Sequence, residues 1–176
     1  FPRAHAVAYV MMAFRIAWFK VYHPLAFYAA YFSIRAKAFD LRIMTGDLKT
    51  QMTEFNRIKA LDRAASPKDK DLMSALEVSM EMYQRGYRFV NVDIQHSEAR
   101  RFSIKDGALL PPFLAIDSLG ETVADAIVAE REERPFTSLK DLQRRCKVSN
   151  TIIDLMKELK CCGELPEDEQ MSLFGA

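Results

Sequence analysis

Apolar side chains recur at three- and four-residue steps through most of this 176-residue chain, and this spacing restricts the fold class to mainly α. The clearest example is residues 3–22, where the spacing predicts one long helix with a wide buried face. We interpret the apolar residues of this segment as core residues. They are Val7, Val10, Met11, Met12, Phe14, Trp18 and Val21.

Proline and glycine divide the first half of the chain into further helices. Pro24 disfavours helical geometry in the residue before it and suits the first position of a new helix, which predicts a helix over residues 25–38. A third helix is expected after the break at Gly46. A fourth is predicted between the cap at Ser66 and the stop at Gly86.

A small β element is predicted after residue 86, where the apolar period shortens from about four residues to two. The alternating apolar residues are Val90, Val92 and Ile94. Downstream, residues 102–104 and 108–110 flank a turn that contains Asp106 and Gly107. An Asp-Gly pair tolerates positive φ, so this pattern predicts a β-hairpin.

The last third is predicted to be helical again. One helix covers residues 121–133, and Ser138 and Ser149 cap two more, the second of which runs to about residue 160. A Pro-Pro pair at 111 and 112 marks a boundary. We therefore expect a helical region with a β-hairpin, a helical module and a flexible acidic tail, at residues 1–110, 111–163 and 164–176.

Charge is distributed unevenly, although the formal net charge is only +1. Residues 1–46 hold six basic residues and one acidic residue, a net charge of +5. Residues 163–176 hold four acidic residues and no basic one, a net charge of −4. The basic end is therefore suited to phosphates and the acidic end is not.

Composition argues against several classes of protein. The hydrophobic content of 49% is enough for a packed core, and the longest uninterrupted apolar run is shorter than a membrane span. Three cysteines, two of them adjacent, and three scattered histidines predict neither disulfides nor a metal site and favour a reducing cytoplasm. The chain begins with Phe1 and has no initiator Met, so we interpret it as a piece of a longer protein.

Residues 113–120, followed by the helix that begins at Glu121, have the pattern of a helix-hairpin-helix. Such a turn directs backbone N–H groups and a helix N-terminus at a DNA phosphate without reading base sequence. The residues predicted to contact DNA are Ser118, Leu119, Gly120 and Thr122. Ser118 replaces the first of the two usual glycines, and a plain helical hairpin with a Gly turn explains the same pattern.

The C-terminal tail contains a glutamine followed by spaced apolar residues: Gln170, Met171, Ser172, Leu173 and Phe174. A short peptide of this form can place apolar anchors in a pocket of a partner protein, while the glutamine makes directed hydrogen bonds. A disordered end that happens to be apolar is the alternative.

The first predicted helix begins with basic and aromatic residues. His5 and Tyr9 lie four residues apart and share a helix face, so together with Arg3 they can offer a donor, a ring and a charge to a nucleotide. A structural role for the histidine is the alternative.

Four stretches of the chain, residues 1–9, 19–32, 140–149 and 165–174, resemble the PolC-type α subunit of bacterial DNA polymerase III, and they occur in the family's order. The resemblance implies that residues 1–110 belong to the fingers region and that Arg3, His5 and Tyr9 lie near the incoming deoxynucleoside triphosphate. It implies that residues 111–163 grip duplex or primed DNA and that residues 170–174 bind the sliding clamp. Met171 stands where the family commonly has leucine.

The same resemblance implies that the catalytic aspartates and their two Mg²⁺ ions lie upstream, in the palm, so that this chain binds no cofactor and is inactive alone. We therefore expect the C-terminal part of a cytoplasmic, replicative DNA-directed DNA polymerase. A free-standing, non-enzymatic helix-hairpin-helix adaptor that binds the clamp is the alternative, and a purely structural helical bundle would bind no DNA.

Overall fold

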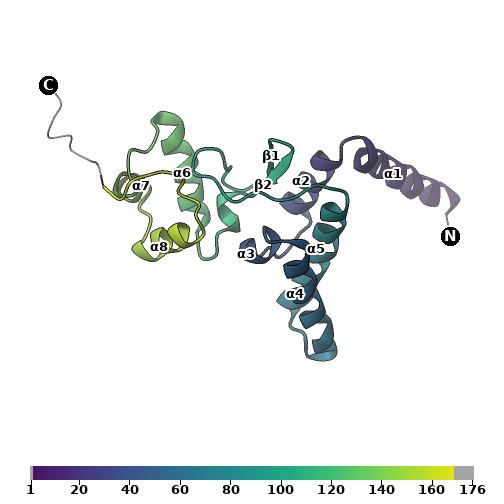
Figure 1. Cartoon of the computed structure of the whole chain (residues 1–176). Coiled ribbons are helices and arrows are strands. Elements are labelled where there is room, and N and C mark those ends of the chain that lie inside the picture. Colours follow the sequence, from purple (N-terminus) through teal and green to yellow (C-terminus); the bar gives the residue numbers. More distant parts are fainter. Residues whose placement is uncertain (1, 169–176) are drawn as a thin grey trace, which may run out of the picture.

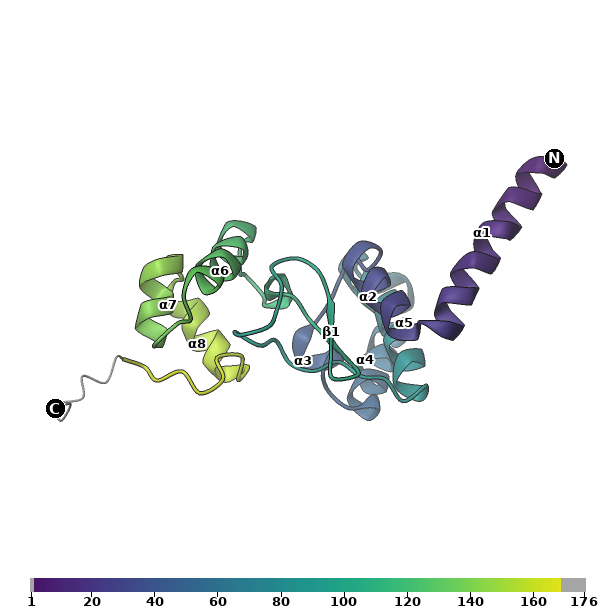
Figure 2. The ribbon, with the colours of Figure 1, turned by 90° about the horizontal axis from the view of Figure 1, so that it is seen from above.

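The computed structural model describes residues 2–168 and confirms a mainly α fold with one small sheet (Figure 1). Two groups of helices, α2–α5 and α6–α8, lie on either side of the β-hairpin (Figures 1 and 2). The elements are α1 (Arg3–Tyr22), α2 (Pro24–Ile34), α3 (Leu41–Met44), α4 (Leu48–Leu61), η1 (Asp62–Ala64), α5 (Pro67–Gln84), β1 (Ser103–Lys105), β2 (Ala108–Leu110), η2 (Phe113–Ala115), α6 (Glu121–Glu133), α7 (Leu139–Cys146) and α8 (Asn150–Glu158).

The first helix, α1, projects away from the rest of the chain, and none of its residues is buried (Figure 2). The prediction of a buried face was therefore wrong within this chain, because Phe14 is 73% exposed and Trp18 is 49% exposed. Apolar side chains surround α1 on all sides, which is typical of a helix enclosed by a larger protein or by lipid. By length and composition α1 could also cross a membrane, although Arg15 and Lys20 interrupt its apolar run.

Polar side chains cap α3, α4 and α5, and the cap at Ser66 is the one that the sequence predicts, whereas α2 begins at Pro24 without a side-chain cap. At the start of α5, the Ser66 hydroxyl accepts a hydrogen bond from the Asp69 N–H, and the Asp69 carboxylate accepts one from the Ser66 N–H, both at 3.1 Å. The inner faces of these helices meet in the first core. Its buried residues include Tyr28, Phe32, Met44, Ile58, Leu72, Leu76, Met82, Phe89, Phe102 and Leu109.

A buried glutamine fixes α3, α4 and α5 relative to one another. Gln51 is fully buried; its Nε2 donates to the Met44 carbonyl at 3.1 Å, and its Oε1 accepts from the Ser79 hydroxyl at 2.6 Å. The Tyr83 hydroxyl donates to the same Met44 carbonyl at 2.8 Å. Because both ends of the amide are hydrogen-bonded, these bonds offset the cost of burying this polar group.

The β-hairpin is confirmed, but the strand predicted over residues 90–94 was wrong. β1 pairs antiparallel with β2 across Asp106 and Gly107, which have φ values of 50° and 75°. Val92 and Ile94 are buried in alternation as predicted, yet no strand lies beside them among the described residues. The Ile94 N–H donates instead to the Cys161 carbonyl at 3.1 Å, so this extended segment connects the hairpin to the end of α8.

The helices α6–α8 enclose the second core. Three of its residues, Leu41, Val92 and Ile94, come from before the boundary predicted at residue 111, so the second core draws on both sides of that boundary. The buried residues on its C-terminal side include Phe113, Ile116, Leu119, Ile127, Phe136, Leu142, Cys146, Val148, Ile153, Met156, Cys161 and Cys162.

Beyond α8 the chain turns back and lies against α7. The N–H groups of Leu139 and Lys140 donate to the carbonyls of Pro166 and Glu167, at 2.9 and 3.2 Å. Lys157 forms an ion pair with Glu167 at 2.7 Å. The predicted tail is thus in contact with the α6–α8 module over residues 165–168, and these carbonyls satisfy two amides at the start of α7.

Candidate nucleic-acid interface

The predicted helix-hairpin-helix is formed by η2, a turn and α6. Ser118 has a left-handed backbone with φ of 63°, and Leu119 is only 6% exposed because it enters the second core. Gly120 caps α6 with an ordinary extended backbone, φ −74° and ψ 154°. A Cβ added at Gly120 would meet no atom within 4 Å, so the space beside this residue is open to a partner.

The start of α6 presents unpaired amides at this turn. Among residues 2–168, the N–H groups of Gly120, Glu121 and Thr122 have no hydrogen-bond acceptor, and the first α6 amides with a partner are those of residues 123 and 124. The positive end of the helix dipole lies at the same place. These amides and Thr122, which is exposed, form a surface suited to a phosphate oxygen.

Two carboxylates beside this turn pair with one arginine, which offsets part of their negative charge. Arg100 pairs with Glu121 and with Asp125, each at 2.5 Å. The hydrogen bond from Arg100 lowers the pKa of Asp125 below its ordinary value. Arg100 therefore reduces the repulsion that acidic groups at the start of α6 would exert on a phosphate.

A second hairpin, between α7 and α8, repeats the first in detail, and sequence reasoning missed it. Lys147 has a left-handed backbone with φ of 54°, Val148 is 3% exposed, and Ser149 caps α8 with φ −70° and ψ 156°. Both turns therefore consist of a left-handed residue, a buried apolar residue and an extended cap. No acidic residue lies in the first turn of α8. The available signal in the sequence was a second run of a small residue, an apolar residue and a helix-capping residue. A lysine at the first of these positions obscured it.

A buried carboxylate joins the loop before α7 to the body of that helix. Asp141, 2% exposed, accepts hydrogen bonds from Arg144 at 2.9 Å and from Arg134, Arg145 and the Thr137 N–H, each at 3.3 Å. Burial acts to raise the pKa of Asp141, but these donors outweigh it and lower the pKa below its ordinary value. Asp141 thereby holds the end of α6 and the loop before α7 against the first turns of α7.

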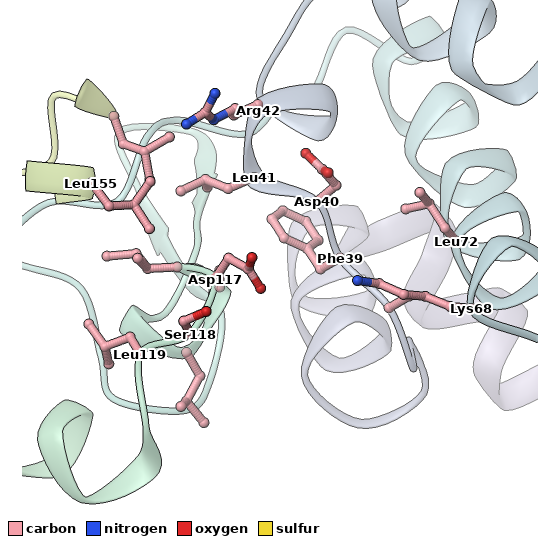
Figure 3. A pocket seen from close by; sticks show the side chains of 15 residues that line it. Phe39, Asp40, Leu41, Arg42, Lys68, Leu72, Asp117, Ser118, Leu119 and Leu155 are labelled. Atoms are coloured by element: carbon pink, nitrogen blue, oxygen red, sulfur yellow. The ribbon is translucent and has the colours of Figure 1, made fainter. Parts of the chain in front are cut away.

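The first turn also lines a cleft of about 370 Å³ between the two groups of helices (Figure 3). Asp117, Ser118 and Leu119 lie on one wall, and Asp40 and Lys68 lie on the other (Figure 3). Two carboxylates and two basic side chains line this cleft, so its charge does not favour an anion over a cation.

The remaining predicted residues lie away from the hairpins. His5 and Tyr9 are exposed near the free end of α1 with ring centroids 4.5 Å apart, and Arg3 is the first residue of that helix. The structure thus brings His5 and Tyr9 onto one face, as predicted. The predicted clamp peptide, 170–174, lies outside the described residues. Among residues 2–168, no group of three or more His, Cys, Asp or Glu residues could hold a metal ion.

Comparison with known proteins supports these observations. A family model described as "Helix-hairpin-helix motif" matches residues 86–170, which include both hairpins. The protein named "DNA polymerase III PolC-type" from Caldanaerobacter subterraneus subsp. tengcongensis is 48% identical over 99% of this chain. The chain is homologous to part of the PolC-type DNA polymerase III. Proteins of the same name from Streptococcus suis and Streptococcus pyogenes are 49% and 46% identical over 99% of the chain.

The resemblance to the PolC-type family is therefore confirmed, and so is the helix-hairpin-helix motif. The chain spans 12% of the length of each of these curated PolC-type relatives. Because 99% of the chain aligns with them, the similarity includes the exposed helix α1 as well as the α6–α8 module.

Proposed function

We propose that this chain is the part of a PolC-type replicative polymerase that grips duplex DNA and tethers the enzyme to its sliding clamp. The observation that carries the proposal is the pair of hairpins with matching backbone geometry, at Ser118–Gly120 and at Lys147–Ser149. They occur in a segment that matches a helix-hairpin-helix model and PolC-type relatives together.

Each hairpin presents first-turn amides to a phosphate, and a phosphate contact carries no information about base sequence. The grip is therefore sequence-independent and salt-sensitive, since phosphate contacts release counterions. Two hairpins supply few contacts, so the isolated chain binds duplex DNA at about micromolar strength or more weakly.

The test is binding of the chain to labelled duplexes of different sequence over a range of salt concentrations. Gly120→Val fills the open space beside the first turn without a clash inside the protein, and should weaken binding to every duplex alike. Thermal melting of the variant reports on folding, and the loss of a good cap should cost no more than about 1 kcal/mol. Binding by the wild type that depends on base sequence or ignores salt would contradict the proposal.

The exposed helix α1 favours the interpretation that this chain is part of a larger enzyme over the alternative that it is a free-standing adaptor. An adaptor with such a helix would expose a large apolar surface to water, which promotes aggregation. In the parent enzyme α1 packs against upstream parts of the polymerase, and its free end places Arg3, His5 and Tyr9 at the incoming deoxynucleoside triphosphate.

In the full-length enzyme, His5→Ala and Tyr9→Ala should raise KM for the nucleotide or lower kcat and leave the melting temperature largely unchanged. A large loss of stability with normal kinetics would assign both residues to packing.

The tail supplies the clamp contact in this proposal. Gln170 donates and accepts hydrogen bonds, Leu173 and Phe174 are the apolar anchors, and Met171 replaces leucine at similar size. Each anchor contributes about 1.5–3 kcal/mol of apolar transfer, offset by ordering of the peptide, so the affinity is about micromolar. Because DNA holds the polymerase beside the clamp, the local concentration of the tail near the clamp is high enough for tethering.

The tail is tested with a peptide of residues 164–176 and a second peptide in which Leu173 and Phe174 are alanine. Titration with the sliding clamp of a bacterium that carries a PolC-type polymerase should detect binding by the first peptide alone. Equal binding by both, or none by the first, would remove the tail from the proposal. Polymerase chemistry, with its Mg²⁺ ions, belongs in this proposal to the upstream palm of the cytoplasmic parent enzyme.

A further inference from the structure

The outer face of α7 carries a row of basic residues that begins at the second hairpin. Lys140 and Arg144 are four residues apart and share one face of α7, and Lys147 directly follows the last residue of that helix. All three are exposed. The nine residues 139–147 contain four basic residues and one carboxylate, a net charge of +3 in a chain whose total is +1.

The two ends of this row have different surroundings. Lys147 is the left-handed residue of the second hairpin and has no ion-pair partner among the described residues. Lys140 forms an ion pair with Asp168, the last described residue of the segment that folds back on α7. The row thus runs from a turn that presents amides for a phosphate to the segment that precedes the proposed clamp peptide.

The middle residue is held in position by the buried carboxylate. Arg144 is 69% exposed and donates to Asp141 at 2.9 Å, while Arg134 and Arg145 donate to the same carboxylate at 3.3 Å. Arg145 also pairs with Glu130 at 2.9 Å, so two carboxylates contact these three arginines, and the Arg144 guanidinium is held at the surface of α7.

We propose that the α7 row, Lys140, Arg144 and Lys147, is a track for the DNA backbone that extends the grip of the second hairpin toward the root of the clamp-binding tail. The inference rests on the proposed function. A helix rises about 1.5 Å per residue, so the row covers about 10 Å, or about three base steps along one strand. A phosphate bound at the Lys147 turn is therefore followed by neighbours within reach of Arg144 and Lys140.

The segment that folds back on α7 limits this track, because Asp168 forms an ion pair with Lys140 at the far end of the row. The proposal therefore has two consequences of opposite sign. Removal of a positive charge from the row weakens DNA binding, and removal of the Asp168 charge strengthens it.

The experiment measures binding of the complete chain to a short labelled duplex as a function of salt. Arg144→Gln and Lys147→Asn each remove one positive charge; asparagine tolerates the left-handed backbone at 147. Each should lower affinity about eightfold at about 0.1 M salt and reduce the slope of log affinity against log salt by about 0.9. Lys70→Gln, in an exposed first-turn position of α5, is the matched control and should change neither quantity.

Asp168→Asn should raise affinity by a similar factor, and adding Lys140→Gln should remove that gain. Asp154→Asn, at an exposed position of α8, is the matched control for the loss of a carboxylate. Melting curves identify any variant that fails to fold, and Lys147→Asn does not touch the Asp141 contacts, so at least one variant stays informative.

The results separate the two proposals. No salt-dependent duplex binding by the wild type would refute the duplex grip itself. Normal binding by both row variants, alongside a weakened Gly120→Val variant, would refute the α7 track alone. Loss of clamp binding with unchanged DNA binding in the row variants would also overturn it, and would assign the row to the clamp.

Discussion

Replacement of Asp141 by alanine tests whether one buried carboxylate holds the connection between α6 and α7 together. Asp141 is 2% exposed and accepts hydrogen bonds from three arginines and from the Thr137 N–H. Arg134 and Arg144 are 60% and 69% exposed, so hydration by water replaces most of the interaction that each guanidinium loses with Asp141. Arg145 is 11% exposed and would keep its ion pair with Glu130 at 2.9 Å.

The cost of the change follows from these exposures. Removal of one partner from a fully buried ion pair costs about 3–5 kcal/mol; the two exposed arginines and the Glu130 pair that Arg145 keeps place this case below that range, at about 2 kcal/mol. For a chain of this length, each kcal/mol lowers the melting temperature by about 2–4 °C, so Asp141→Ala should melt about 4–8 °C below the wild type. Asp154→Asn, at an exposed site on α8, is the control and should melt with the wild type.

The pH dependence of this difference has a definite sign. The pKa of Asp141 is lowered in the folded chain, so its carboxylate stabilises the fold above the unfolded pKa, about 3.9, and this contribution disappears as pH falls through the folded value. Calorimetry of both proteins should show the gap in melting temperature at neutral pH and its loss in acid. Equal melting temperatures at neutral pH, or a gap that persists in strong acid, would refute the reasoning.

Three further variants and one activity assay test other parts of the structure. Ser118→Gly should raise stability by about 0.5 kcal/mol in denaturant titration, because glycine relieves the left-handed strain at 118 at some cost in unfolded-state entropy; a loss would contradict this. Gln51→Leu should cost about 2 kcal/mol in the same assay, because the buried Ser79 hydroxyl loses its acceptor; an unchanged midpoint would show that solvent replaces it. Deletion of residues 1–22 should convert a self-associating chain into a monomer by light scattering, since α1 is apolar on all sides; a monomeric intact chain would contradict this. The purified chain should extend no primed template with Mg²⁺, and extension would place catalytic residues within it.

Local sequence determined most helix starts and the β-hairpin. The cap at Ser66, the Asp-Gly turn at 106 and 107 and the cap at Ser149 each act through hydrogen bonds or backbone preferences within a few residues, so no tertiary knowledge was needed to place them. The four stretches that resemble the PolC family were likewise visible in the residues themselves, and the relatives confirm them.

Only the tertiary structure decided which apolar faces are covered and where extended segments find partners. The spacing in α1 indicates a helix but does not say whether this chain covers it, and here it does not. Alternation over residues 90–94 correctly predicts that Val92 and Ile94 are buried, but a strand also needs a neighbour, and Ile94 bonds to Cys161 instead. The second hairpin was hidden for a similar reason, because lysine rarely signals a left-handed backbone and the packing of Val148 in the second core depends on residues far away in the sequence.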